Sequence, residues 1–320
     1  MTNLRIVTGC AGFIGSNLVD SLLAQGHQVL GIDNLSTGQR RFLADALANP
    51  AFTFVTADLA DPATAAHHFG GAEIVYHLSA NADVRFGALH PRRDLEQNTI
   101  VTFNVLEGMR ANAVRRIVFS STGSVYGEAS VIPTPEDAPF PVQTSLYGAS
   151  KLACEGLIAA YCETYGFQAW IFRFVSILGH RYTHGHVFDF YRQLLADPKT
   201  LRVLGDGRQR KSYLDVSDCL AAVHMAVARG GDPVNVFNLG VDGYCEVRDS
   251  IRWITEALGV TPELVFGGGD RGWVGDNPFI YLDASRMRAL GWQPQFSIEE
   301  GVRRTVDFLR KNEWVFENRS

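Results

Sequence analysis

A short β-favouring run, a glycine-rich turn and an amphipathic run follow one another at the start of this 320-residue chain. Residues 4–8 form the first run, Gly9, Gly12 and Gly15 follow at three-residue spacing, and residues 16–24 carry apolar side chains at helical period. In a strand–turn–helix unit, these glycines permit a tight turn, close approach of the backbone to a pyrophosphate, and packing of the helix on the strand. The free N–H groups at the start of such a helix favour phosphate. We therefore expect a nucleotide-binding turn, with a purely structural turn as the alternative.

A second β-favouring run, residues 28–32, leads to Asp33, which lies eighteen residues beyond Gly15. A carboxylate there can accept hydrogen bonds from both ribose hydroxyls of an adenosine, and it would repel a 2′-phosphate. The position favours NAD over NADP. Arg40 and Arg41, the next cations along the chain, are the opposing signal.

Strand and helix patterns continue to alternate through the first half of the chain. This alternation predicts an α/β fold with a Rossmann-type doubly wound parallel sheet, followed by a smaller C-terminal α/β region. We place the division at 1–175 and 176–320. The further expected strands are residues 52–55, 74–78, 116–121 and 169–175, and the main expected helices are 94–112, 145–165, 187–196, 247–258, 283–290 and 298–311. Asn98 falls on an otherwise apolar face of its helix, and we expect its amide to brace neighbouring loops.

Tyr147 and Lys151 lie four residues apart on one of the predicted helices. This spacing brings a phenol and an ammonium to one helix face, about 5–6 Å apart. A neighbouring cation lowers the pKa of a tyrosine, so the pair is a candidate acid and base for an alcohol proton. The same spacing is also common on exposed helix faces. A hydroxyl cluster, Ser120 to Ser124, ends the preceding strand, where open α/β sheets bind ligands.

Composition excludes several functions. A net charge of −5 without a basic stripe argues against a nucleic-acid partner. No apolar run approaches the ~18–20 residues of a membrane helix, and the first strand begins too early to leave room for a signal peptide. Five cysteines without metal-type spacing suggest free thiols in a reducing cytoplasm. We expect a cytoplasmic protein without a metal site.

Four cations fall within a short stretch of the otherwise acidic second half: Arg202, Arg208, Arg210 and Lys211. Such a cluster suits a phosphate-bearing substrate, although a solvated charge run is the alternative. Arg271 lies in a second polar loop, 267–278, that could close over the same pocket.

The glycine turn with Asp33, the hydroxyl cluster and the Tyr147/Lys151 pair occur in an order that resembles the extended short-chain dehydrogenase/reductase superfamily over essentially the whole chain. More detailed strings resemble the UDP-glucose 4-epimerase group. These are Asp33-Asn-Leu-Ser-Thr-Gly38, Ser120-Ser-Thr122, Tyr147-Gly-Ala-Ser-Lys151 and Gly205-Asp-Gly-Arg-Gln-Arg-Lys-Ser-Tyr213. The strings at 182–185 and 271–276 are most similar to compact archaeal-type members of that group.

This resemblance implies a mechanism and a cofactor. NAD stays tightly bound, and Tyr147 takes the proton of the sugar 4-hydroxyl while hydride passes to the nicotinamide. Thr122, or alternatively Ser124, hydrogen-bonds the same oxygen. Lys151 holds the nicotinamide ribose and keeps Tyr147 acidic. The 4-keto sugar then turns over and hydride returns to its other face. The resemblance also implies a homodimer joined through helices 94–112 and 145–165.

The resemblance and the strand ends together assign the remaining site residues. Asp58 and Leu59 are expected near the adenine, and small residues after the fourth strand let backbone pass close to the cofactor. The cofactor set is Gly9, Gly12, Phe13, Ile14, Gly15, Asp33, Asn34, Ser36, Thr37, Gly38, Asp58, Leu59, Leu78, Ser79, Ala80, Asn98, Ser120, Tyr147, Lys151 and Phe174. The substrate set is Thr122, Ser124, Ser176, His186, Val187, Arg210 and Arg271. Ser176 and His186 stand where the group has asparagines, which leaves the sugar open.

Several other functions compete with C4 epimerisation of a UDP-glucose or UDP-galactose type substrate. The nearest is 4-epimerisation of a UDP-sugar acid or UDP-N-acetyl sugar, which one or two pocket contacts would decide. A 4,6-dehydratase would carry Thr-Asp-Glu where Thr122-Gly-Ser124 stands, and a UDP-glucuronate decarboxylase has no specific support. A dehydrogenase that releases NADH as a product would need added NAD, whereas an epimerase would not. A non-catalytic NAD-binding regulator would be expected to lack Tyr147, Lys151 or the hydroxyl cluster, and all are present.

Overall fold

The computed structural model describes residues 3–81, 84–140, 142–273, 276–277 and 279–317. The chain forms two compact units. Unit 1 comprises Met1–Val125, Ser145–Arg173 and Val223–Phe237, and unit 2 comprises Tyr126–Thr144, Phe174–Ala222 and Asn238–Ser320. The chain therefore passes between the units several times. Among the described residues, no helix is long and apolar enough to cross a membrane.

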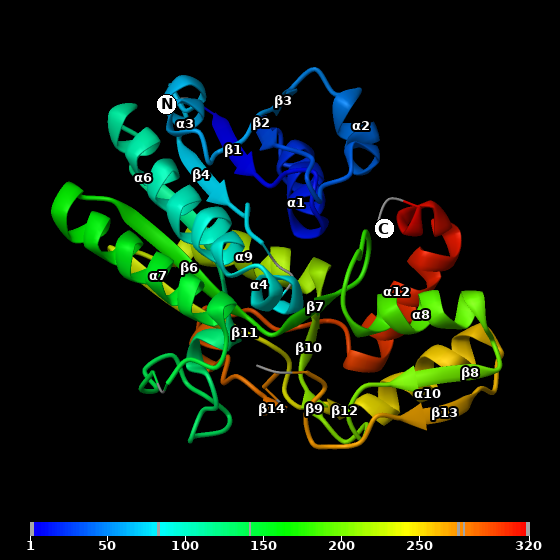
Figure 1. The fold of residues 1–320 in the computed structure, drawn as a ribbon. Coiled ribbons are helices and arrows are strands. Elements are labelled where there is room, and N and C mark those ends of the chain that lie inside the picture. The colour runs from blue at the N-terminus through cyan, green and yellow to red at the C-terminus, as the bar shows by residue number, and fades with distance from the viewer. Residues whose placement is uncertain (1–2, 82–83, 141, 274–275, 278, 318–320) are drawn as a thin grey trace. The chain divides into compact units, whose positions relative to one another are not determined.

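A seven-stranded sheet forms the centre of unit 1 (Figure 1). The pairs β1–β2, β2–β3, β1–β4 and β4–β5 are parallel, as the alternating pattern predicts. In spatial order the strands are β11 (Val234–Leu239), β6 (Gln168–Phe174), β5 (Arg116–Thr122), β4 (Ile74–His77), β1 (Leu4–Thr8), β2 (Gln28–Asp33) and β3 (Phe52–Thr56). The predicted strands end within one residue of these positions, but β11 was not predicted.

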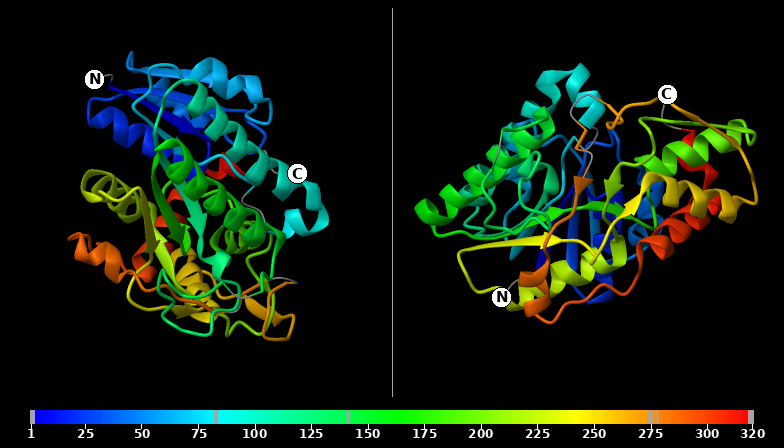
Figure 2. Two further views of the ribbon diagram at one scale, coloured as in Figure 1. Left: turned by 90° about the vertical axis from the view of Figure 1, so that its left-hand side faces the viewer. Right: turned by 90° about the horizontal axis from the view of Figure 1, so that it is seen from below.

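Helices cover both faces of this sheet, as a doubly wound fold requires. The left view of Figure 2 shows α1 and the end of α9 on one face and α6 and α7 on the other. A hydrogen bond between Ser21 Oγ and His224 Nε2 (2.8 Å) joins α1 to α9. The helices are α1 (Phe13–Ala24), α2 (Ala44–Leu47), α3 (Pro62–His68), α4 (Val84–Leu89), α5 (Pro91–Asp94), α6 (Val101–Ala111), α7 (Leu146–Tyr165) and α9 (Val216–Arg229), with 3₁₀ turns at Arg40–Leu43 and Gly123–Tyr126.

The helix expected over 94–112 is interrupted in its first half. A π-helical segment, Leu95–Ile100, separates α5 from α6. The wider turn contains Asn98, whose Oδ1 accepts from Asn81 N (2.8 Å) and whose Nδ2 donates to Ser150 Oγ (2.8 Å). Asn98 thus braces the loop after β4 against α7, which confirms its predicted bracing role. π-turns of this kind occur frequently at functional sites.

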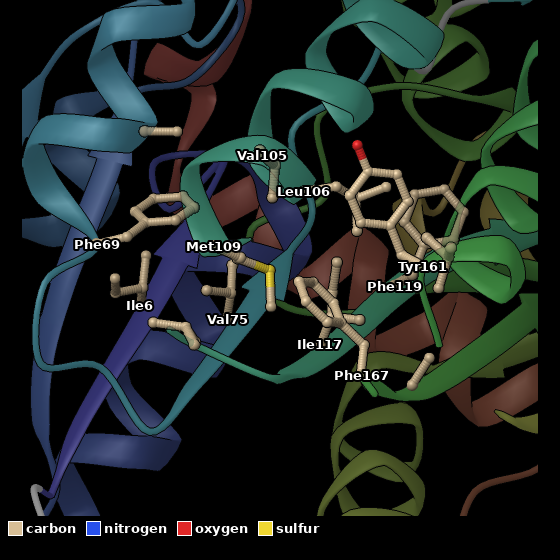
Figure 3. Close-up of a cluster of buried hydrophobic side chains, with 14 of the residues drawn as sticks. Ile6, Phe69, Val75, Val105, Leu106, Met109, Ile117, Phe119, Tyr161 and Phe167 are labelled. Carbon is tan, nitrogen blue, oxygen red and sulfur yellow. The ribbon is translucent and has the colours of Figure 1, made fainter. Parts of the chain in front are cut away.

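The main hydrophobic core of unit 1 lies between the sheet and helices α3, α6 and α7. Figure 3 shows Phe69 and Met109 facing Ile6 and Val75 on one side, with Phe119 and Tyr161 beyond them. Phe69, Met109 and Phe119 are fully buried. Full burial of such a side chain stabilises the fold by roughly 1.5–3 kcal/mol, so this cluster fixes α6 and α7 on the sheet.

Unit 2 is built from three helices and small strand pairs. Helices α8, α10 and α12 pack on one another. Two of them have the predicted bounds, because capping boxes at Glu246/Asp249 and Ser297/Glu300 define where they begin. The elements are β7 (Ser176–Leu178), α8 (His186–Ala196), β8 (Thr200–Val203), β9 (Arg210–Lys211), β10 (Tyr213–Asp215), β12 (Cys245–Glu246), α10 (Val247–Leu258), β13 (Glu263–Phe266), β14 (Phe279–Ile280), α11 (Ser285–Ala289), α12 (Ile298–Lys311) and a 3₁₀ turn at Glu313–Phe316.

Candidate functional site

The glycine turn joins β1 to α1 in the way that its spacing predicts. Gly9 has a φ of +68°, and its N–H donates to Ile32 O (2.8 Å) on the neighbouring strand. A Cβ on Gly15 would lie 2.0 Å from Gly9 O, so only glycine lets the helix approach the strand this closely. A Cβ on Gly12 would meet only Gly9 O, at 3.2 Å. The backbone at Gly12 is therefore open to a bound group.

Asp33 is the last residue of β2 and its carboxylate lies beside this turn. Its Oδ2 accepts from Ala11 N (2.9 Å) and its Oδ1 from Leu35 N (2.8 Å). Burial raises the pKa of Asp33, while these two backbone donors act in the opposite direction. A Cβ on Gly38 would come within 2.7 Å of Oδ1, so glycine is required where the loop crosses the carboxylate.

The other predicted cofactor residues of unit 1 follow the ends of the same strands. Asn34 Nδ2 donates to Asp58 Oδ2 (3.0 Å), and Ser36 Oγ donates to Asn34 Oδ1 (2.7 Å), which joins the loops after β2 and β3. The structure places Phe13 and Ile14 in the first turn of α1, Thr37 in the loop after β2, Leu59 after β3, Leu78, Ser79 and Ala80 after β4, and Ser120 near the end of β5. Phe174 ends β6 and is assigned to unit 2.

The hydroxyl cluster lies at the carboxyl end of β5, as predicted. Thr122 ends the strand, and its Oγ1 accepts from Ser124 N (3.1 Å) and lies 3.2 Å from Ser124 Oγ. The Thr122 side chain also interacts with Tyr147 and lowers the pKa of its phenol. Thr122 therefore connects the end of β5 to the first turn of α7.

Tyr147 lies in the first turn of α7, whose N-cap Ser145 accepts from Gly148 N (3.0 Å). Desolvation raises the pKa of Tyr147 to about 12, and the interaction with Thr122 counteracts only part of that shift. The expectation that Lys151 lowers this pKa is wrong, because the Lys151 ammonium donates to Ser120 O instead. Tyr147 therefore keeps its proton at neutral pH.

Lys151 is buried one turn further along α7 and points toward β5. Its Nζ donates to Ser120 O (2.8 Å) and lies 4.6 Å from the centroid of the Phe119 ring. Burial lowers the pKa of Lys151 to about 8. The ammonium remains mostly protonated at pH 7, although this environment reduces its basicity.

A buried ion pair that the sequence analysis missed holds α7 against the sheet. Glu155 accepts from Arg173 of β6 through Nε (3.1 Å) and Nη2 (2.7 Å), and Ser121 Oγ donates to Glu155 Oε1 (2.5 Å). Glu155 lies four residues after Lys151 and eight after Tyr147, so it shares their helix face. This helical spacing is the sequence feature from which the position of Glu155 on that face could have been predicted. Glu155 thus fixes the register of α7 against the strand that ends in Thr122.

Arg210 of unit 2 is an exposed cation held between aromatic rings. Its guanidinium carbon lies 4.0 Å from the centroid of Phe279 and 5.5 Å from that of Tyr244. Among the described residues, none accepts a hydrogen bond from it. Stacking fixes the plane of the guanidinium and leaves its N–H edges available for acidic oxygens.

Arg271, also in unit 2, is already paired. Its Nη2 donates to Glu128 Oε1 (2.6 Å) and its Nη1 to Asp276 O (3.2 Å). A substrate that used Arg271 would have to compete with Glu128, a partner that sequence reasoning did not identify. The predicted string 271–276 includes Val274 and Gly275, which lie outside the described residues.

The two positions that depart from the family pattern differ in burial. Ser176 begins β7 and is exposed, whereas His186 opens α8 and its Nε2 lies 2.6 Å from Ser250 Oγ. Burial, with a smaller contribution from Lys211, lowers the pKa of His186 to about 3, so the imidazole is neutral at pH 7. Val187, the next residue of α8, is fully buried.

Residues 5–240 match the sequence profile of the NAD dependent epimerase/dehydratase family. The chain belongs to this family. It is 35% identical over 314 residues to the UDP-glucose 4-epimerase of Mycolicibacterium smegmatis, which covers 95% of this chain and 98% of the relative.

Solved structures agree with this family membership. A UDP-galactose 4-epimerase superposes with a TM-score of 0.87 at 36% identity, covering 97% of this chain and 100% of the other. The UDP-glucuronic acid 4-epimerase of Bacillus cereus, solved in complex with UDP-glucuronic acid and NAD, superposes with a TM-score of 0.89 at 25% identity, covering 96% and 99%. Similar folds in this family thus act on different UDP-sugars.

NAD is the cofactor of this epimerase/dehydratase family, and the residues of unit 1 fit it. The open backbone at Gly12 and the first N–H groups of α1 suit a pyrophosphate. The carboxylate of Asp33, at the end of the neighbouring strand, suits the ribose hydroxyls of an adenosine.

Proposed function

We propose that this chain is a 4-epimerase of a UDP-hexose of the glucose or galactose type, with tightly bound NAD and a transient 4-keto sugar. The observation that carries the proposal is the hydrogen-bonded group at the carboxyl end of β5. There, the Thr122 side chain lies close enough to Tyr147 to lower its pKa, and Lys151 lies one turn further along the same helix. The 35% identity to a UDP-glucose 4-epimerase supports the glucose type of substrate.

The proton steps belong to this group. When bound, NAD takes up and returns the hydride and adds a positive charge near the site. Tyr147 accepts the proton of the sugar 4-hydroxyl and later returns it, while Thr122 hydrogen-bonds the same oxygen. Because the pKa of Tyr147 is about 12, the base form needs cationic stabilisation. Lys151 is the cation of this chain that supplies it, if its ammonium leaves Ser120 O.

Epimerisation accounts for the hydroxyl cluster better than dehydration does. Gly123 and Ser124 follow Thr122, and Ser124 is occupied by its bonds with Thr122. Elimination of water needs a further acid and base at the sugar, and neither residue provides a carboxyl group. We propose Arg210, rather than the paired Arg271, as the main contact of the substrate diphosphate, because its N–H edges have no described acceptor.

A sugar acid or N-acetyl sugar is the second candidate substrate. It is favoured by Ser176 and His186, which replace the asparagines of the UDP-glucose 4-epimerase group, and by the similarity to a UDP-glucuronic acid 4-epimerase. One changed hydrogen-bonding group can shift specificity by orders of magnitude. The two candidates share the proton chemistry and differ only in the sugar.

The test is incubation of the purified protein, without added cofactor, with UDP-glucose, UDP-galactose, their N-acetyl forms and UDP-glucuronate, followed by NMR of the sugar region. We expect the 4-epimer of UDP-glucose or UDP-galactose to form. A 4-epimer from UDP-glucuronate or an N-acetyl sugar alone would select the second candidate. Absence of any 4-epimer, even with NAD supplied, would contradict epimerisation of both.

A further inference from the structure

The amino-terminal edge of the unit 1 sheet, opposite the edge that carries the glycine turn, contains an open cavity of about 230 Å³ with both polar and apolar lining residues. Arg5 and Ile74 are register partners at the starts of β1 and β4, and Arg116 begins the adjacent strand β5. At about 3.3 Å per residue, the five residues of β1 separate this edge from Gly9 by roughly 15 Å. The cavity is therefore distinct from the nucleotide-binding turn.

The described residues that line this cavity carry cationic and hydrogen-bonding groups, and none of them has a carboxylate. Its apolar part comes from β4 and the end of α9. Its polar lining residues are Arg5, Gln25, His27, Tyr76, Arg116 and His224. In a chain with a net charge of −5, such a lining favours an anion over a cation.

Tyr76 supplies an unpaired donor to the cavity. Its side chain is only 3% exposed, and none of the described residues hydrogen-bonds its hydroxyl. Burial raises the pKa of Tyr76 to about 12, so the hydroxyl keeps its proton and can donate. The hydroxyl is not among the fully buried polar atoms that lack a partner, so it is reached from the open cavity, where a bound anion can accept from it in place of water.

The two arginines are held in place but not neutralised. Glu73, which does not line the cavity, forms ion pairs with both Arg5 and Arg116, the second at 2.9 Å. One carboxylate between two guanidinium groups leaves a net positive charge. The guanidinium of Arg116 also lies 5.0 Å from the Trp170 ring centroid, which orients its plane. A fixed guanidinium fork matches the oxygens of phosphate and carboxylate groups.

Each of the two histidines is anchored through one ring nitrogen. His27 Nδ1 lies 2.6 Å from Asn3 Oδ1, and Asn3 Nδ2 donates to Gly26 O, so the amide oxygen faces the ring. His27 Nδ1 is therefore the donor in that bond, and in the neutral ring its Nε2 is an acceptor, so His27 does not donate to an anion. His224 is held through Nε2 by Ser21, which leaves its Nδ1.

We propose that this cavity is a second binding site, which takes the phosphate or carboxylate group of a small metabolite. Arg5 and Arg116 pair with the anionic oxygens, and the Tyr76 hydroxyl donates a hydrogen bond to one of them. The volume of this cavity is several times the ~30 Å³ that one water molecule occupies in the liquid. The cavity can therefore hold an anionic group together with a short carbon skeleton. Because the ligand contacts β1, β4 and β5 together, its binding stabilises unit 1.

The experiment titrates inorganic phosphate and, separately, citrate into the protein saturated with NAD and UDP, so that other phosphate-binding sites are filled. Calorimetry at constant ionic strength, with chloride as the reference salt, measures affinity, and thermal unfolding measures stabilisation. We expect saturable binding of at least one anion and a raised Tm. Binding of phosphate alone or citrate alone would identify the preferred group.

Matched variants locate the binding. We expect Tyr76→Phe and Arg116→Gln each to weaken it about tenfold or more, as expected for loss of one charged or buried hydrogen bond. Tyr165→Phe, on an exposed tyrosine of α7, and Arg252→Gln, on an exposed arginine of α10, should leave it unchanged. Tyr76→Phe should fold with about the stability of the parent without anion, since no described residue hydrogen-bonds the hydroxyl that it removes. Absence of saturable binding would overturn the proposal. So would Tyr76→Phe and Arg116→Gln variants that bind the anion as tightly as the parent protein.

Discussion

In the proposed mechanism the phenol of Tyr147 transfers the proton, so removing its hydroxyl tests proton transfer separately from folding. We predict that Tyr147→Phe lowers turnover by about 10²–10⁴-fold, the usual contribution of a positioned acid or base, while the fold is retained. NMR of the sugar region with the best substrate measures the rate. The control is Tyr165→Phe at the other end of α7, which should keep the parent rate. Near-parent turnover in Tyr147→Phe would refute the assignment.

His77 makes the fold sensitive to acid. It is buried between Thr8 Oγ1 (2.8 Å) and Thr102 Oγ1 (3.0 Å), and burial, with a smaller effect of Lys151, lowers its pKa from 6.5 to about 3. Between these values the unfolded chain binds a proton that the folded chain does not, so the free energy of unfolding falls as pH decreases. His186 acts in the same direction.

We predict that His77→Gln, which keeps an amide for the two threonines, reduces this dependence. Urea unfolding at pH 7.5, 6.5, 5.5 and 4.5 measures the slope of stability against pH. The parent should lose stability steadily below about pH 6.5, and the variant should lose less. An unchanged slope in the variant would show that His77 is not a source of the acid sensitivity.

At the scale of elements, the contact between α7 and the sheet depends on one buried ion pair. Removing one partner of such a pair leaves an uncompensated charge and destabilises a protein by about 3–5 kcal/mol. We predict a loss of this size for Glu155→Gln, measured by urea unfolding, because Arg173 would remain buried. The control is Glu96→Gln, which breaks the exposed pair with Arg92 and should change stability by less than about 1 kcal/mol. Equal effects of the two substitutions would contradict the prediction.

At the scale of the whole molecule, the exposed apolar side chains around α6 predict self-association. Leu95, Ile100 and Phe103 are 43–52% exposed on the π-turn and the start of α6. Clustered exposed apolar residues commonly mark an interface. The homodimer expected through helices 94–112 and 145–165 remains a prediction, which this surface supports.

Phe103→Glu should convert that dimer to a monomer in light scattering, because it would bury a charge at the interface. Leu195→Glu, at a residue of α8 with similar exposure, is the control and should leave the mass unchanged. A monomeric parent protein would refute the dimer itself. A dimer that persists in Phe103→Glu would place the interface elsewhere.

The sequence by itself determined the features that depend on neighbouring residues. The glycine turn, the strands up to β6, and helices α7, α10 and α12 follow from periodicity, capping and backbone constraints within one stretch of chain. Tyr147 and Lys151 were identifiable for the same reason, since helical spacing alone places them on one face. The family resemblance added the expected cofactor, which membership of an NAD dependent family confirms.

Only the tertiary structure decided the properties that depend on residues far apart in sequence. Strand β11 joins the sheet beside β6, although the two strands are about sixty residues apart in sequence. The local sequence pattern did not predict this strand. The pKa of Tyr147 is raised by desolvation in the packed fold, whereas helical spacing to Lys151 alone predicts that it is lowered. The pairing of Glu155 with Arg173 arises because α7 packs on β6. Arg5, Tyr76 and Arg116 meet at one cavity because neighbouring strands bring distant segments to a common edge.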